Sequence, residues 1–125
     1  MQYRNLGHGL NVSAIGVGCM PMIKGGNILY GEAADPDEAI KTIHRAIDLG
    51  ITFFDTAQIY GPFQNEELVG EAIKGKRDGL VIATKFGFRF DGNKIVGVDG
   101  SAANAKASVE GCLKRLGIDC IDLFY

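Results

Sequence analysis

Residues 51–85 read ITFFDTAQIYGPFQNEELVGEAIKGKRDGLVIATK, and this stretch contains the pattern that decides the fold. Two short apolar runs, 51–55 and 80–85, flank a segment at 65–74 whose apolar residues recur with the 3.6-residue period of a helix. Neither run alternates cleanly between apolar and polar residues, which is typical of parallel strands covered on both faces. The stretch therefore predicts a strand–helix–strand unit.

The same alternation continues on both sides of this unit. Residues 13–18 and 118–125 form two further apolar runs that we interpret as strands. A helix is predicted from the Asp35-Pro36 start signal to Gly50, because aspartate caps helices well and proline fits their first position. Another helix is predicted between Ser101 and Gly117, since glycine commonly ends a helix.

The segment in front of these units predicts a β-hairpin. Residues 2–6 and 10–12 are short strand-like segments on either side of Gly7-His8-Gly9, a sequence that favours a tight turn. The chain thus divides into a hairpin at 2–12 and βα units at 13–125, all within one domain.

Repeated βα units build either an open doubly wound sheet or a β/α barrel. A doubly wound dinucleotide-binding domain needs a three-glycine turn that leads directly into a helix. Residues 16–21, GVGCMP, lack the third glycine, and no helical pattern begins before Asp35. We therefore predict a TIM-type (β/α)8 barrel. Since a complete barrel has eight strands, only its first half is present, with four parallel strands and three helices, as a single incomplete domain.

The composition excludes several classes of function. With 13 basic and 15 acidic residues the net charge is −2, so no basic surface for nucleic acid is expected. The apolar runs are too short to cross a bilayer, and the first residues lack the apolar segment of a signal peptide. Three cysteines without paired spacing favour free thiols and a cytoplasmic location. We assign no metal ligands.

Three polar residues fall where barrel enzymes place their chemistry, at the carboxyl ends of strands. Asp55 ends one strand, Lys85 ends the next, and Tyr60 lies in the loop after Asp55. Neighbouring parallel strands lie about 4.8 Å apart, so the carboxylate and the ammonium should meet. An ammonium beside a phenol favours the phenolate form and makes the phenol a better proton donor. Tyr60 could then protonate a carbonyl oxygen while a cofactor delivers hydride. A structural ion pair beside a packing tyrosine would fit the same pattern.

The chain resembles the aldo-keto reductase family in segments that follow the family order and span nearly all of its length. These segments are Ile51–Gly61 followed by Asn65–Gly70, then Leu80–Gly87, then Ser108–Gly117 with Ile121–Leu123. Tyr60-Gly61-Pro62-Phe63 is similar to the bacterial and plant-type branch. The resemblance implies an NADP(H)-dependent oxidoreductase that reduces aldehydes and ketones to alcohols.

The resemblance also implies an Asp, Tyr, Lys and His catalytic tetrad. Asp55, Tyr60 and Lys85 match three of its members, and the histidine is expected directly after Tyr125. His8 lies in the hairpin that plugs the opposite barrel end in the family, and His44 lies within an outer helix. We expect neither to replace the histidine.

For the cofactor, the resemblance implies backbone contacts near Gly18, Cys19 and Met20, together with Asp55. Most nicotinamide and phosphate contacts in the family come from the second half of the barrel. NADPH rather than NADH is therefore expected from the resemblance alone. Cys19 is expected to be unreactive.

Two long loops, 20–34 and 86–100, should lie at the same end of the barrel, where loops often carry specificity. In the second loop, Asp91-Gly92 predicts a small hairpin. Side chains from both loops could contact substrate or nicotinamide, or could serve only in packing: Met20, Met22, Tyr30, Phe86 and Phe88.

Half a barrel leaves two sheet edges and much apolar surface open. We therefore expect the chain to belong to a longer protein, or to self-associate through these edges, and to be inactive alone. The expected partner is a small carbonyl or alcohol substrate. The alternative function is that of a truncated, non-catalytic binding subunit that keeps the scaffold, and the sequence after Tyr125 would distinguish the two.

Overall fold

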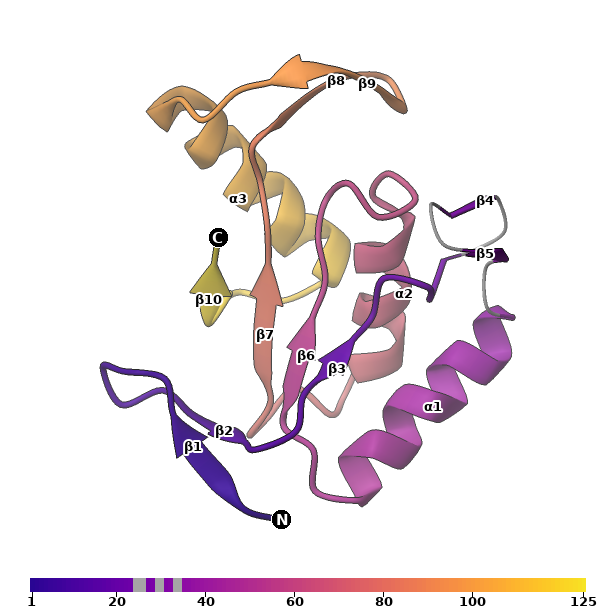
Figure 1. Ribbon diagram of the computed structural model, residues 1–125, viewed down its shortest axis with the longest axis vertical. Coiled ribbons are helices and arrows are strands. Elements are labelled where there is room, and N and C mark those ends of the chain that lie inside the picture. Colours follow the sequence, from indigo (N-terminus) through magenta and orange to yellow (C-terminus); the bar gives the residue numbers. More distant parts are fainter. Residues whose placement is uncertain (24–26, 29–30, 33–34) are drawn as a thin grey trace.

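The computed structural model describes residues 1–23, 27–28, 31–32 and 35–125. At its centre lies a parallel sheet in the spatial order β3-β6-β7-β10 (Figure 1). Its strands are Val17–Gly18, Phe53–Asp55, Val81–Thr84 and Leu123–Phe124. Each strand of this sheet pairs with the next one along the chain, which is the order of a β/α barrel. A doubly wound sheet would reverse its order part-way.

The helices of the described residues, α1, α2 and α3, form a layer against this sheet, with α1 packed on α2 and α2 packed on α3 (Figure 1). Their bounds are Pro36–Asp48, Gln64–Ile73 and Ala102–Leu116. The predicted start signals are confirmed. The Asp35 side chain accepts hydrogen bonds from two backbone N–H groups of α1, and the Ser101 side chain accepts one from Asn104. Gly117, in a left-handed conformation, ends α3.

The apolar core lies between the sheet and the helices. Phe54 of β6 and Ile82 of β7 are fully buried there, against Ile43 of α1, Leu68 of α2 and Leu116 of α3. Phe53, the neighbour of Phe54 in β6, faces away from the helices. It borders a hollow of about 360 Å³ between the first hairpin and strands β3 and β6. The helix face of the sheet is therefore packed, whereas β3 and β10 form its open edges.

Strands β1 (Tyr3–Asn5) and β2 (Asn11–Ser13) form the predicted antiparallel hairpin. It is joined to the start of β6 by two reciprocal hydrogen bonds of 2.9 Å, from Ser13 N to Thr52 Oγ1 and from Thr52 N to Ser13 Oγ. The prediction of one strand over 13–18 is wrong. Ser13 belongs to the hairpin, and its hydroxyl donates to Ile15 O (2.6 Å), so the backbone turns before β3.

The last strand is also shorter than the predicted 118–125. The Asp122 carboxylate, rather than backbone, accepts the hydrogen bond of Ile82 N (2.7 Å) and binds the Arg77 guanidinium (2.6 Å). Arg77 also donates to Cys120 O (3.0 Å). Asp122 N also donates to Ile82 O (3.1 Å), so ahead of β10 the chain is joined to β7 by one backbone hydrogen bond and by the Asp122 side chain.

Further antiparallel strand pairs lie in the described parts of the long loops. β8 (Phe88–Asp91) pairs with β9 (Lys94–Val98), which confirms the turn predicted after Asp91. β4 (Asn27–Ile28) pairs with β5 (Gly31–Glu32). Tyr30 lies outside the described residues. In the described part of the chain, no helix combines the length and the apolar character needed to cross a membrane.

Candidate active site

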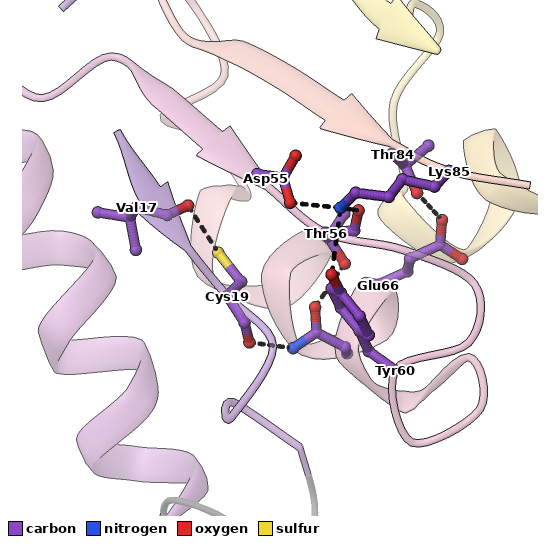
Figure 2. A network of polar contacts seen from close by, with 9 residues as sticks. Val17, Cys19, Asp55, Thr56, Tyr60, Glu66, Thr84 and Lys85 are labelled. Carbon is purple, nitrogen blue, oxygen red and sulfur yellow. Dashed lines mark hydrogen bonds and ion pairs between the residues drawn. The ribbon is translucent and has the colours of Figure 1, made fainter. Parts of the chain in front are cut away.

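The side chains of Asp55, Tyr60 and Lys85 meet at the carboxyl ends of β6 and β7 (Figure 2). Lys85 Nζ forms an ion pair with Asp55 Oδ1 and donates hydrogen bonds to Tyr60 Oη (3.2 Å) and Thr56 O (2.9 Å). Asp55 pairs in register with Ala83, so Lys85, two residues further, lies on the same side of the sheet. The strand spacing had predicted this meeting.

The electrostatics of the cluster keep the lysine charged. Partial burial of Lys85 opposes its charged form, but the hydrogen bonds to Asp55 and Tyr60 and the negative charge of Asp55 outweigh this effect. The pKa of Lys85 is therefore raised above its ordinary value. The side chains of Lys85 and Asp55 remain 33% and 29% exposed, so a ligand can reach the ion pair. An ammonium thus faces a phenol at an accessible rim.

The loop that carries Tyr60 is held in shape by its own backbone. Tyr60 N donates to Ala57 O (3.1 Å), and Phe63 N donates to Gln58 O (2.8 Å). Gly61 adopts a φ of 81°, and a Cβ at this position would stand 3.0 Å from Ile23. Both the left-handed conformation and the close approach require glycine here. This tight loop turns the tyrosine back over the strand ends.

The residues predicted to contact the cofactor follow β3, beside this cluster. Gly18 pairs with Asp55, and Cys19 N donates to Asp55 O (2.8 Å). Gly18 is exposed, and no atom lies within 4 Å of the position that a Cβ would take. The Cys19 side chain is fully buried, and this burial raises the pKa of its thiol to about 12. Met20 is half-buried. A stretch of open backbone therefore borders the Asp55 carboxylate.

The sequence of residues 14–125 matches that of the Aldo/keto reductase family. The chain belongs to this family. It is 38% identical to the aldo-keto reductase AKR11C1 from Bacillus halodurans, solved in its holo form, over 99% of this chain and 39% of that one (TM-score 0.84). It is 32% identical to the glycerol dehydrogenase AKR11B4 from Gluconobacter oxydans, over 98% of this chain and 37% of that one (TM-score 0.78). The chain spans about two fifths of the length of these proteins.

The comparisons confirm the predicted fold class. The family is built on the TIM barrel, and the parallel sheet of this chain has the sequential strand order of that barrel. The family comprises oxidoreductases that act on carbonyl compounds. Its fold brings the carboxyl ends of the strands to one rim, which is where the Asp55, Tyr60 and Lys85 cluster lies.

Other residues singled out from the sequence have structural contacts. His44 Nε2 lies 2.8 Å from Ala72 O, and therefore links α1 to α2, whereas His8 is exposed in the turn of the first hairpin. Met22 is buried in the core, which favours packing. In the loop after β7, the Phe86 ring stacks on that of Phe124, with centroids 5.1 Å apart. Phe88 is half-buried in β8.

Sequence reasoning missed two polar residues at the start of α2. Asn65 and Glu66 are fully buried, with Asn65 bonded to Thr56 and Glu66 bonded to Thr84. Figure 2 shows Glu66 beside Thr84 and Lys85. The apolar residues whose helical period predicts this helix at 65–74 begin at Leu68 and Val69. Asn65 and Glu66 precede these two residues by three positions each, so they extend the same face by one turn. That spacing was the available signal.

Proposed function

We propose that this aldo-keto reductase chain carries the proton-donating half of an NADP(H)-dependent carbonyl reductase. The substrates would be aldehydes and ketones, reduced to alcohols, and the reverse oxidation would use the same groups. The observation that carries the proposal is the contact of 3.2 Å between the Lys85 ammonium and the Tyr60 hydroxyl, with Asp55 paired to the same ammonium.

Each side chain has one task in the proposed reaction. Tyr60 gives its hydroxyl proton to the carbonyl oxygen as the carbonyl carbon receives hydride. The Lys85 ammonium stabilises the phenolate that remains, because a positive charge lies next to the oxygen where negative charge develops. Asp55 keeps that ammonium charged and aimed. In alcohol oxidation the phenolate takes the proton back.

The nicotinamide, when bound, supplies or accepts the hydride. The open backbone at Gly18 fits a flat ring, because no side chain fills the space beside Asp55. Gly18→Val should fill this space without straining the backbone, since the φ of Gly18 is not in the left-handed region. We expect weaker binding of NADPH, measured by nucleotide fluorescence in the full-length protein. An unchanged dissociation constant would contradict this placement.

Oxidation of NADPH with 4-nitrobenzaldehyde, in the full-length protein, tests the acid role. Tyr60→Phe is expected to lower turnover by about 10²–10⁴-fold, the usual contribution of general acid–base catalysis. Lys85→Met should lower turnover as well. Tyr3→Phe is the matched control, because Tyr3 is an exposed tyrosine on the first hairpin. Undiminished turnover in folded Tyr60→Phe would remove the proposal.

Three finer properties belong to the same proposal. The preference for NADPH over NADH rests on the family resemblance. A cytoplasmic location is supported by three cysteines that are all free thiols.

The edge strands β3 and β10 would pair with further strands in the active protein, because open edges are prone to association. Sedimentation of the 125-residue chain should then show self-association, and a monomer that binds NADPH would contradict this last point.

A further inference from the structure

We infer that Asn65 and Glu66 are positioning residues. They hold Tyr60 and Lys85 in place relative to residues 19–22, the segment that follows β3. The inference rests on the proposed function for its catalytic meaning. Its structural basis is independent of that function. Both residues are fully buried at the start of α2, and their side-chain hydrogen bonds run to the rim or to α3.

Asn65 joins three segments of the rim. Its side-chain amide donates hydrogen bonds to Cys19 O and Met22 O, both at 2.6 Å. Its side-chain oxygen accepts from Thr56 Oγ1, and its backbone N–H donates to Tyr60 O (3.2 Å). Both amide hydrogens and the amide oxygen are thus engaged. Aspartate would lack the donors and leucine would lack all three partners, so the chemistry at this position calls for an amide.

These bonds reach the reacting groups through one intermediate residue. Thr56 directly follows Asp55, and its carbonyl oxygen accepts a hydrogen bond from Lys85 Nζ (2.9 Å). Asn65 therefore fixes Thr56 by its side chain and Tyr60 by its backbone. A loss of this bridge would let the phenol and the ammonium move relative to the segment at 19–22.

Glu66 acts on the neighbouring strand. Its carboxylate accepts a hydrogen bond from Thr84 Oγ1 (2.6 Å) and pairs with Arg115 Nε (2.6 Å) from α3. Thr84 is the last residue of β7 and directly precedes Lys85. The position of Lys85 is thereby fixed from its amino-terminal side, as that of Tyr60 is fixed by Asn65.

The opposite end of the sheet offers a matched control. There the Arg77 guanidinium and the Asp122 carboxylate form a comparable partly buried network at the start of β7. It contacts none of the three candidate catalytic side chains. Asp122→Asn should therefore weaken folding without altering the rim.

The test compares Asn65→Ser, Thr56→Val and Thr84→Val with Asp122→Asn in the full-length protein. We measure kcat with 4-nitrobenzaldehyde and, separately, the ¹³Cζ resonance of Tyr60, assigned through Tyr60→Phe. A misplacement of about 1 Å costs on the order of 10²-fold in rate. In Asn65→Ser, Thr56→Val and Thr84→Val, here called the rim variants, we expect kcat losses up to that size and a displaced Tyr60 resonance. We expect neither change in Asp122→Asn.

The two readouts separate the failure of this inference from that of the proposed function. A Tyr60 resonance that moves in the rim variants, in a protein without turnover, would support the positioning role and refute the reductase. Rim variants whose kcat and resonance match those of Asp122→Asn would overturn the positioning role. Thr56→Val is nearly isosteric and removes a single hydrogen bond, so it decides the question if Asn65→Ser does not fold.

Discussion

Replacement of Arg115 by methionine should destabilise this protein far more than the loss of an ordinary ion pair. The Glu66 side chain is 0% exposed and the Arg115 side chain is 18% exposed, with Nε 2.6 Å from the carboxylate. The guanidinium also lies 4.4 Å from the centre of the Phe63 ring. Methionine keeps most of the apolar length of arginine, so the change removes mainly the charge, with its hydrogen bonds to Glu66 and Cys112.

The expected cost follows from burial. When one partner of a buried ion pair is removed, the other charge stays in the interior without compensation, which typically costs about 3–5 kcal/mol. Glu38 and Lys41 form the contrasting pair, with side chains 67% and 70% exposed. Exposed pairs contribute little, because water already solvates both charges. Lys41→Met should therefore leave the free energy of unfolding unchanged within error.

Equilibrium urea unfolding, followed by far-UV circular dichroism, measures both variants. The single variant Glu66→Gln and the double variant Glu66→Gln with Arg115→Met complete the cycle, since glutamine can still accept a hydrogen bond from the Thr84 hydroxyl while it carries no charge. We expect the double variant to be more stable than Arg115→Met alone by at least about 1 kcal/mol, as coupled sites commonly are. If Arg115→Met costs no more than Lys41→Met, the buried pair does not stabilise the fold as argued.

Three further results are expected. At pH 8, Ellman's reagent should label Cys120, which is exposed, while Cys19 and Cys112 stay protected until unfolding, because burial raises the pKa of both thiols to about 12. Since these folded-state pKa values exceed the ordinary 9.0, the free energy of unfolding should be unchanged below pH 9 and fall as the pH rises toward 12. Labelling of three thiols in the native protein would refute the protection of Cys19 and Cys112. Gly70→Ala should cost about 1–3 kcal/mol in thermal unfolding, because its Cβ would stand 2.6 Å from Leu116 O, and an unchanged Tm would contradict this helix contact.

The sheet order and the Asp55, Tyr60 and Lys85 cluster were predictable from sequence for a simple reason. Apolar runs and helical periods identify βα units, and parallel strands bring their carboxyl ends to the same edge. A residue that directly follows such a run must therefore lie at the rim. The loop residue Tyr60 was harder to place, and the turn at Gly61 is what carries it back.

The remaining errors concern strand bounds and buried polar residues. They come from side chains that bond to the backbone and from polar side chains that are buried in the fold. The Asp122 carboxylate takes a ladder position in front of β10, and the Ser13 hydroxyl turns the chain before β3. Neither contact can be predicted from the pattern of apolar residues in the sequence. Asn65 and Glu66 are buried by partners from distant segments, such as Arg115, so their role depends on tertiary contacts that local periodicity does not contain.

The sequential strand order also bears on how the chain assembles. Each new strand needs only the one before it as a template, with a single helix in between, so the pairings that build the sheet involve modest separations along the chain. Parallel pairing is slow because a connecting segment must be closed first, and sequential pairing keeps each of these segments down to a single strand–helix–strand connection. During synthesis, Val81–Thr84 can settle on Phe53–Asp55 before Leu123–Phe124 has left the ribosome, and growth then continues outward from the newest strand without any earlier pairing having to break.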